Sequence, residues 1–305
     1  MPQEHGRAIE LRHLRYFIAV AETGSLTEAA ERRLYTSQPS LSRQIRDLES
    51  HVGVQLLSRS VRGVEPTPAG KVFLDHARLV LMHVDAAVET ARRAAQPQRK
   101  TFAIGFQTGH EMNWLSPVMQ MLHDELQENQ VTVSSDYSPD LAEALARGRL
   151  DLAFLRVEPG YDLEYHVVDS EPLIVLMPSD HGLTARSCVS PDALVNEIFI
   201  GGWNKASVLS AVTEDYFRRC GLDFRLDHGV DNLAMAISLV ASTRGVALMP
   251  EYAKNLLPPS VVSRPLEGEP PTIDIAVGYS NSNTSPVLGR LVARLDELVR
   301  VNQRL

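Results

Sequence analysis

Residues 37–49 read SQPSLSRQIRDLE and decide the fold of the N-terminal region. Ser37 can cap a helix by accepting a backbone hydrogen bond, and Pro39 suits the first turn, where a missing N–H costs little. At 100° per residue, the apolar side chains share one face, which we expect to be buried. These side chains belong to Leu41, Ile45 and Leu48. The segment therefore predicts an amphipathic helix that ends near His51.

The opposite face of this helix is polar and basic. A major groove admits such a helix, in which Gln38 can bind adenine and Arg43 can bind guanine through two hydrogen bonds each. Serine hydroxyls and the free amides at the helix start suit phosphate. The candidate DNA contacts on this helix are Ser37, Gln38, Pro39, Ser40, Ser42, Arg43 and Arg46. An ordinary solvated helix face is the alternative interpretation, because arginines and serines are common on surfaces.

The flanking segments favour the DNA-binding interpretation. Upstream, residues 11–22 predict a helix, and Ser25 with Glu28 matches a capping box that opens a second helix over about 26–34. Downstream, residues 56–68 read LLSRSVRGVEPTP and predict two strands with a tight turn at Arg62-Gly63. A hairpin after such helices is a winged helix-turn-helix. Arg59 and Arg62 would then point the wing at the phosphate backbone.

A long helical pattern runs from about Pro68 to Ala95 with a continuous apolar stripe. Such a stripe needs a partner, and a second copy of the chain in a dimer is the natural one. Packing against its own chain is the alternative. Residues 96–100, QPQRK, have the composition of a linker.

Beyond residue 100, short strands alternate with helices, which is the signature of a parallel α/β sheet. The expected strands are 101–106, 131–136, 150–155, 173–177, 197–200, 225–230, 246–249 and 272–279. The expected helices are 113–127, 139–147, 206–220, 232–242 and 285–303. Two α/β lobes with a cleft between them would resemble periplasmic binding proteins.

Ligands of open α/β sheets bind outside the carboxyl ends of the strands. Helices that start there present free amides, which favour an anion such as a carboxylate. The candidate effector contacts in these loops are Gln107, Thr108, His110, Ser138, Arg156, Trp203, Asn204 and Asn232. Trp203 could stack on a ring. Its alternative role is packing within a lobe.

Charge is unevenly spread along the 305 residues. The net charge of −8, taken alone, argues against nucleic acid as a partner. Residues 11–64 nevertheless hold 8 basic and 5 acidic residues, a net of +3, whereas residues 97–305 hold 17 and 27, a net of −10. A locally positive module can therefore bind phosphate while the rest of the chain is acidic. The length predicts two or three domains.

Other classes of function find little support. The first residues lack the apolar stretch of a secretory signal, no apolar run is long enough for a membrane span, and the cysteines are few, so we expect a cytoplasmic protein. His110-Glu111 lacks the second histidine of a helical zinc pair, and no catalytic or nucleotide-binding motif stands out. We therefore expect no enzyme activity, cofactor or metal. Cys188 and Cys220 leave a thiol switch as a minor alternative.

Several segments together resemble the start of LysR-type transcriptional regulators. They are LRHLRYFIAVAETGSLTEAA at 11–30, SQPSLSRQIRDLE at 37–49, LLSR at 56–59 and TPAG at 67–70. Length and layout extend the resemblance over essentially the whole chain. It implies a winged helix-turn-helix over 1–67, a linker and dimerisation helix over 68–96, and an effector-binding domain over 97–305. Lobe I would comprise about 100–170 and 272–305, and lobe II about 171–271, with crossings near 170–172 and 266–272.

The resemblance also implies partners and roles. Such regulators are typically homotetramers, dimers of dimers, that bind double-stranded promoter DNA and respond to a small inducer. Residues at the positions of Gln38, Pro39, Ser42 and Arg43 approach base edges in this family. The segment from 105–106 through 155–156, and Asn232 with Met235 before 245–250, look most like the branch that answers to phenylpropionate, benzoate or muconate. In that branch the arginine matching Arg156 can engage a carboxylate. The peroxide-responsive branch has paired cysteines that lie much closer in sequence.

Two competing functions remain at this point. The two-lobed half alone would suit a solute-binding protein or carrier, but the N-terminal module and the missing signal oppose it. An enzyme that uses the cleft would need a nucleophile–base or metal constellation, which only residues distant in sequence could provide.

Overall fold

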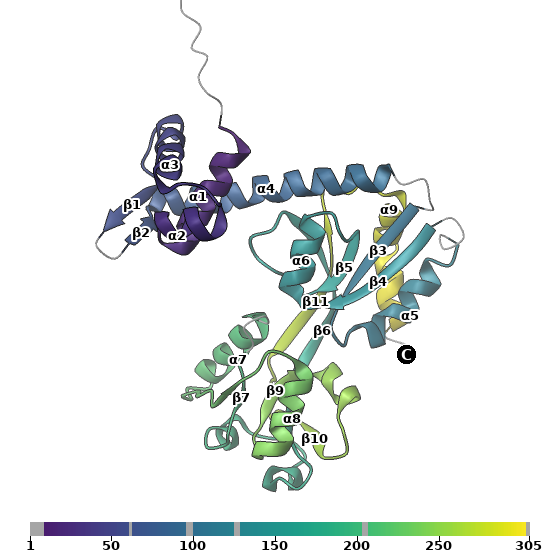
Figure 1. Ribbon diagram of the computed structural model, residues 1–305. Helices are drawn as coiled ribbons and strands as arrows, with labels where there is room; N and C mark the ends of the chain where they lie inside the picture. The colour runs from purple at the N-terminus through teal and green to yellow at the C-terminus, as the bar shows by residue number, and fades with distance from the viewer. Residues whose placement is uncertain (1–8, 61–62, 96–99, 125–128, 203–206, 303–305) are drawn as a thin grey trace, which may run out of the picture. The chain divides into compact units, whose positions relative to one another are not determined.

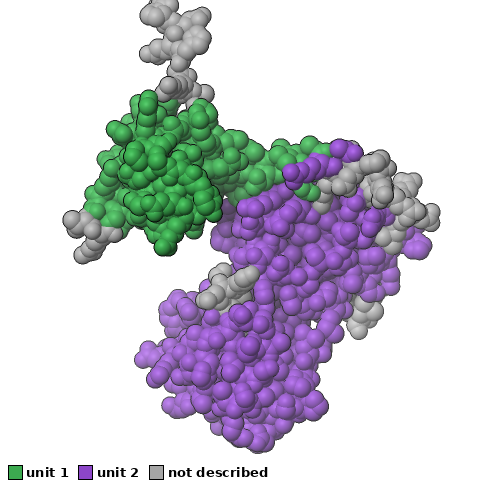
Figure 2. All heavy atoms as spheres, in the orientation of Figure 1, with its two compact units in different colours: residues 1–91 green, residues 92–305 purple. Residues whose placement is uncertain are grey.

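Helices α1, α2 and α3 precede a β-hairpin and the long helix α4 in the first part of the chain (Figure 1). The computed structural model describes residues 9–60, 63–95, 100–124, 129–202 and 207–302. These residues divide into two compact units, Met1–Ala91 and Arg92–Leu305 (Figure 2). Each unit has its own hydrophobic core.

The first unit is built around helices α1 (Leu11–Thr23) and α3 (Gln38–Val52). The predicted cap is present, since the Ser37 hydroxyl accepts a hydrogen bond from the Ser40 amide at 3.4 Å. The predicted core face of α3 is also confirmed, because its apolar side chains are buried. They are Leu41, Ile45 and Leu48.

The second helix differs in detail from the expected 26–34. Its first turn is α2 (Leu26–Glu28), and a π-helical turn, η1 (Ala29–Arg33), follows, with the Leu34 amide bonded to the Ala29 carbonyl at 3.0 Å. Only half of the expected capping box forms. The Ser25 hydroxyl accepts from the Glu28 amide, but the Glu28 carboxylate pairs with Arg32 instead of returning to Ser25.

The predicted hairpin consists of β1 (Leu57–Ser60) and β2 (Gly63–Pro66), paired antiparallel. A carboxylate from α3 holds its base. Glu49 accepts from the Leu56 amide at 2.8 Å and from the Leu57 amide at 3.0 Å. The start of the wing is therefore tied to the predicted recognition helix.

The TPAG segment opens α4 (Pro68–Ala94) with a compact turn. The Thr67 hydroxyl accepts from the Gly70 amide at 3.0 Å and donates to the Gln55 carbonyl at 2.8 Å. A Cβ atom on Gly70 would lie 1.9 Å from the Leu56 carbonyl oxygen. Only glycine lets α4 begin this close to the wing.

The second unit contains a mixed sheet in the order β10-β6-β11-β5-β3-β4, with β9 also paired to β6. Strands β3 (Lys100–Gln107), β4 (Asn129–Asp136) and β5 (Leu152–Leu155) are parallel, as expected. Strand β11 (Thr272–Ser280) lies antiparallel to both β5 and β6 (Leu163–Pro178).

Alternating side chains of this sheet build the two faces of lobe I. Phe102, Ile104 and Phe106 of β3 pack with helices α5 (Glu111–Met121), α9 (Pro286–Val292) and α10 (Leu295–Asn302). On the other face, Ala103 packs against α6 (Ser138–Ala146). Buried β-branched and aromatic residues thus position the carboxyl ends of β3 and β5, where a ligand is expected.

Lobe II forms around the second half of β6, which pairs with β9 (Ala247–Pro250) and β10 (Val261–Pro265). Helices α7 (Ser207–Arg219) and α8 (Leu233–Thr243) contribute to its core, and β7 (Ile200–Gly201) pairs with β8 (His228–Gly229). The turns η3 (Gly182–Ala185), η4 (Pro191–Leu194) and η5 (Glu251–Leu256) complete it. Within the described part of the chain, no helix has the length and hydropathy to cross a bilayer.

The expected and observed elements differ at several places. The predicted strand 173–177 is the second half of the 16-residue strand β6, so the chain passes between lobes without leaving the sheet. The predicted helix 285–303 breaks between α9 and α10, where Arg294 turns back to the Met121 carbonyl at 3.2 Å. The predicted strand 225–230 shortens to His228–Gly229. Strand β10 was not expected.

Candidate functional site

The exposed face of α3 carries most of the predicted DNA contacts. Pro39, Ser40, Arg43 and Arg46 are exposed and Gln38 is half-buried. Arg46 donates from Nε to the Ser42 carbonyl of its own helix at 3.3 Å. The face is therefore a basic, polar surface that begins at a capped helix N-terminus, the arrangement that a major groove accepts.

Ser42 differs from the expectation that it belongs to this open surface. It is only 9% exposed, and its hydroxyl accepts a hydrogen bond from Arg59 Nη2 at 3.1 Å. Position 42 lies on the flank of α3 that meets the wing, so this serine orients Arg59 of β1. Arg62, the other predicted wing contact, lies outside the described residues.

Tyr35 is a candidate that sequence reasoning passed over. It lies in the turn before α3, is 88% exposed and has a backbone φ of +49°. A non-glycine residue in the left-handed region is uncommon and marks a tightly constrained turn. A large exposed aromatic residue beside the predicted recognition helix was visible in the sequence, but its exposure was not.

The second unit holds a pocket lined by both lobes, with about 530 Å³ of space not filled by protein, part of it open to solvent. Its polar lining comes from lobe I: Gln107, Thr108, Tyr137, Ser138, Arg156 and Glu158. Its other lining residues are mostly apolar: Val208, Leu209, Leu233, Met249, Pro250, Tyr252 and Ile273. Four of the predicted effector contacts therefore meet at one pocket, namely Gln107, Thr108, Ser138 and Arg156.

Ser138 organises the polar edge of this pocket. It is the first residue of α6, where its hydroxyl donates to Gln107 Oε1 at 2.5 Å and accepts from the Arg156 amide at 2.8 Å. Three segments, the end of β3, the start of α6 and the end of β5, are thus joined through one buried side chain. The parallel strands deliver these ends to the same edge of the sheet, as expected.

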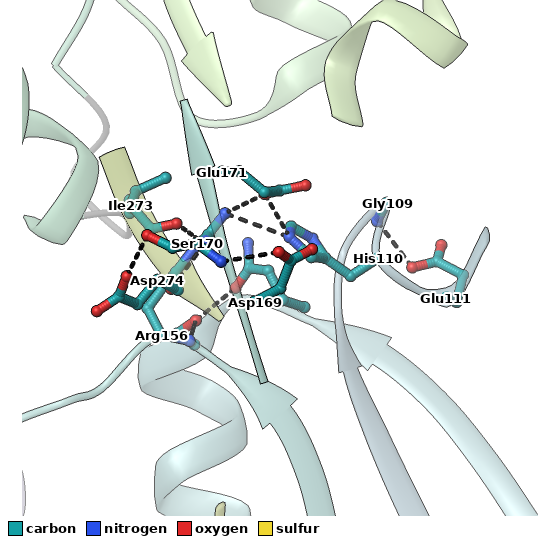
Figure 3. Close-up of polar contacts among 11 residues, drawn as sticks. Gly109, His110, Glu111, Arg156, Asp169, Ser170, Glu171, Ile273 and Asp274 are labelled. Carbon is teal, nitrogen blue, oxygen red and sulfur yellow. Dashed lines mark hydrogen bonds and ion pairs between the residues drawn. The ribbon is translucent and has the colours of Figure 1, made fainter. Parts of the chain in front are cut away.

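The Arg156 guanidinium makes its contacts within the protein (Figure 3). Nη1 donates to the carbonyls of Ile273 at 3.1 Å and Asp274 at 2.7 Å, and Nη2 donates to Glu171 Oε2 at 3.2 Å. Glu171 belongs to β6, and Ile273 and Asp274 belong to β11, the two strands by which the chain passes between lobes. The positive charge of Arg156 is therefore already opposed by a buried carboxylate.

Glu171 stays ionised despite its burial. Burial alone would raise its pKa, but the hydrogen bond from His110 and the nearby charge of Arg156 hold the pKa below its usual value. Ionised Glu171 and Arg156 form a buried pair whose charges cancel beside the pocket.

His110 lies behind this pair and does not line the pocket, which differs from the expectation. Its Nε2 is 3.0 Å from Glu171 Oε2 and 3.3 Å from Arg156 Nη2, and its ring packs against Tyr252 of lobe II at 4.3 Å. Burial lowers the pKa of His110, so the ring is neutral near pH 7. Gly109 permits the contact, because a Cβ there would lie 2.2 Å from the Tyr252 ring.

Glu158 is a lining residue that sequence reasoning missed. It lies three residues beyond the end of β5 and is 7% exposed. Burial raises the pKa of its carboxyl group to about 7. An acidic residue three positions after a predicted strand end was a visible signal, but nothing in the sequence showed that it would be buried.

The remaining predicted effector contacts are not placed at the pocket. Trp203 and Asn204 lie outside the described residues. Asn232 caps α8, since its Oδ1 accepts from the Met235 amide at 2.8 Å and its Nδ2 donates to Asp231 at 2.7 Å. Its neighbour Leu233 reaches the pocket instead. The correction follows from the cap geometry, which turns the amide toward the helix start.

Comparisons with known proteins cover both units. Residues 11–71 match the family described as bacterial regulatory helix-turn-helix protein, lysR family, and residues 95–300 match the LysR substrate binding domain. The chain is 34% identical over 292 residues to the Hca operon transcriptional activator HcaR of Escherichia coli (strain K12), which covers 95% of this chain and 98% of HcaR.

Two solved structures are similar over nearly the whole chain. Full-length BenM, a regulator of Acinetobacter baylyi, has a TM-score of 0.56 at 28% identity, covering 97% of this chain and 98% of that one. Full-length CbnR in complex with its target DNA has a TM-score of 0.55 at 25% identity, covering 96% and 99%.

Proposed function

This chain belongs to the LysR family of transcriptional regulators, and we propose that its effector is an aromatic or other small carboxylate bound in the pocket between the lobes. Its family consists of regulators rather than enzymes. The observation that carries the proposal is the lining of the pocket. One edge is lined by hydroxyl and amide groups, and the facing wall is apolar.

The two sides of the pocket suit the two ends of such a molecule. Thr108 and the N-terminal end of α6 offer hydrogen bonds and a favourable dipole to a carboxylate, and Ser138 holds Gln107 and Arg156 in place at that edge. Leu233, Met249 and Tyr252 offer an apolar and aromatic surface to a ring or an alkyl chain.

Lobe closure is the proposed response to the effector. Both lobes line the pocket, and Arg156 joins its edge to β6 and β11, so a ligand that contacts both lobes favours one angle between them. The ligand can act only through its differential affinity for the two arrangements. The closed arrangement would then reposition the DNA-binding modules in the assembled regulator.

The DNA-binding part of the proposal rests on α3 and the wing. Gln38 and Arg43 would read bases, and Ser37, Ser40, Arg46, Arg59 and Arg62 would contact phosphates. The solved complex of CbnR with its target DNA supports double-stranded DNA as the partner. Since a regulator acts where its promoter DNA lies, a cytoplasmic location is part of the proposal.

Self-association is part of the same proposal. Helix α4 exposes apolar residues along its length, with Val72 61%, Val80 44% and Val88 46% exposed in the single chain. A second copy of α4 would cover such a stripe in a dimer, and two dimers would form a tetramer.

A thermal-shift screen of small carboxylates tests the effector proposal. A ligand at 100 times its dissociation constant stabilises the folded state by about 2.7 kcal/mol. We expect aromatic carboxylates to raise the melting temperature of the wild type, and Ser138→Ala to reduce the shift. Ser134→Ala, an exposed serine on β4, is the matched control and should leave the shift unchanged. If no carboxylate shifts the wild type, the carboxylate proposal is wrong.

DNA footprinting with and without the same ligand tests the response. We expect the protected region or its bending pattern to change when the ligand saturates the pocket. An unchanged footprint at saturation would show that lobe closure is not transmitted to the DNA-binding modules.

A further inference from the structure

One ionisable group in the pocket has no part in the function proposed so far. Glu158 is 93% buried, lines the pocket, and has no hydrogen-bond or ion-pair partner for its carboxyl group among the described residues. Its backbone is engaged instead, since the Tyr165 hydroxyl donates to the Glu158 carbonyl at 3.2 Å. A carboxylate that is largely removed from water, reaches only the pocket and has no partner is costly, so this position requires an explanation.

No described cation compensates a negative charge on Glu158. The titratable groups that share the pocket with Glu158 are Arg156, Tyr137 and Tyr252, and its charge also acts on Tyr161 and on Tyr165 of β6. The charged residues at α6, namely Asp140, Glu143 and Arg147, act on Tyr161. Arg147 pairs with Glu143 at 2.9 Å, and Arg156 pairs with Glu171 at 3.2 Å. Burial alone accounts for the raised pKa of Glu158, about 7.

The charge balance of the pocket therefore depends on this one residue. Arg156 and Glu171 cancel, and His110 behind them is neutral near pH 7 because burial lowers its pKa. The lining is neutral when Glu158 is protonated and carries one negative charge when it is ionised. A carboxylate ligand beside an ionised Glu158 would be repelled by a like charge in a site of low polarity. Two neighbouring carboxylates avoid this repulsion when they share one proton.

We propose that Glu158 recognises the effector as a protonated acid, donating its O–H to the effector carboxylate, so that binding of a monoanion takes up one proton from solvent. The proposal rests on the proposed function, because it assumes that a carboxylate binds in this pocket. An O–H group that donates to a carboxylate makes a short, charge-assisted hydrogen bond, which makes Glu158 a determinant of specificity for anions. The proton from solvent forms an O–H bond with the Glu158 carboxylate, and no other covalent bond changes.

The consequence is a pH-dependent affinity with a defined sign. Small carboxylic acids ionise near pH 4, so the probe remains an anion throughout the neutral range. Well below pH 7, Glu158 already holds the proton and affinity is constant. Above about pH 7, the proton must be acquired on binding, and the dissociation constant should rise about tenfold per pH unit.

Calorimetric titration of the full-length protein tests this directly. The probes are benzoate, 3-phenylpropionate and cis,cis-muconate, titrated from about pH 6 to about pH 9. At about pH 8, each titration is repeated in two buffers of different ionisation enthalpy, which measures the protons taken up per ligand. We expect a value near one for a monoanion and a tenfold loss of affinity between pH 8 and pH 9.

Two variants separate the role of Glu158 from general effects of charge. Glu158→Gln keeps a donor but cannot titrate, so its affinity should be the same at all these pH values. Glu164→Gln changes the same charge at an exposed position of β6, and its affinity should keep the pH dependence of the wild type.

Failure of the proposed role of Glu158 can be distinguished from failure of the proposed carboxylate site. A probe that binds the wild type equally at pH 6 and pH 9, or without proton uptake, overturns the role of Glu158 and leaves the carboxylate site intact. If none of the probes binds at pH 6, the carboxylate part of the proposed function is wrong, and this proposal is wrong with it. If Glu158→Gln does not fold, the two-buffer measurement on the wild type still decides.

Discussion

At the scale of single residues, Arg156 shows what a sequence can and cannot reveal. Its place after a buried strand was predictable, because strand ends follow from the apolar run of residues 152–155. Its partners were not, since Glu171 lies 15 positions away and Asp274 lies 118 positions away, and no local pattern connects them. An arginine expected to contact the effector lines the pocket and also holds the two strands between the lobes.

Replacing Arg156 by Met should therefore reduce stability more than a surface change would. The substitution leaves Glu171 buried without its cation, and breaking a buried pair costs about 3–5 kcal/mol. Chemical denaturation measures the loss. Arg147→Met, which breaks an exposed pair with Glu143, is the control and should cost less than about 1 kcal/mol. The double variant with Glu171→Gln should recover part of the loss. No recovery would mean that Arg156 acts mainly through its carbonyl contacts.

Gly70→Ala tests the close approach of α4 to the wing. The added methyl group would lie 1.9 Å from the Leu56 carbonyl, so the backbone must shift, and we expect a loss of at least about 2 kcal/mol. Gly289→Ala is the matched control, since a Cβ there meets nothing within 4 Å. Alanine should be neutral or stabilising at that helical position by up to about 1 kcal/mol. Equal unfolding free energies for the two variants would contradict the argument from backbone contact.

At the scale of elements, helices and strands were predicted correctly where the spacing of apolar residues was regular. The buried faces of α3 and the strands β3 and β5 followed from apolar spacing. The first half of β6 was missed because its alternation breaks at residues 167–168 and its charged residues interrupt the apolar pattern. The break between α9 and α10 was missed because it involves a distant contact, from Arg294 to the Met121 carbonyl. Glu158 was missed for a related reason, since burial comes from packing and not from residue type.

Arg43 of α3 and Arg59 of the wing should contribute differently to DNA binding. Arg43→Ala should cost about 1–3 kcal/mol on the specific site and less on random DNA, because it would read a base. Arg59→Ala should weaken binding to both DNAs equally, as expected for a phosphate contact. Electrophoretic mobility shifts at fixed salt measure both variants. Equal losses for Arg43→Ala on both DNAs would assign it to phosphate as well.

At the scale of the whole molecule, the charge distribution and the exposed stripe of α4 point to the same requirement. A net charge of +3 over residues 11–64 is small for a DNA-binding surface. Several copies bound together can reach high affinity without stronger contacts in each copy. Binding should therefore depend on assembly.

The double variant Val80→Asp and Val88→Asp tests that dependence. Charges on both exposed positions should prevent two α4 helices from packing, so the protein should sediment as a smaller species and bind DNA at least tenfold more weakly. Ala86→Asp, on the opposite side of the helix by its spacing, is the control and should leave both properties unchanged. A variant that still sediments like the wild type would show that α4 does not carry the dimer.

The uninterrupted path of β6 through both lobes limits how they can move. A loop between lobes would allow rotation about many axes, but a strand bonded to β11 on one side of Pro172 and to β9 and β10 on the other can mainly twist. The proposed closure of the lobes would then proceed mainly by a twist of this strand. Different molecules in the pocket would drive the same motion to different extents. New ligand preferences could therefore be engineered at Val208, Leu233 and Met249 while the mechanical output to the promoter stays the same.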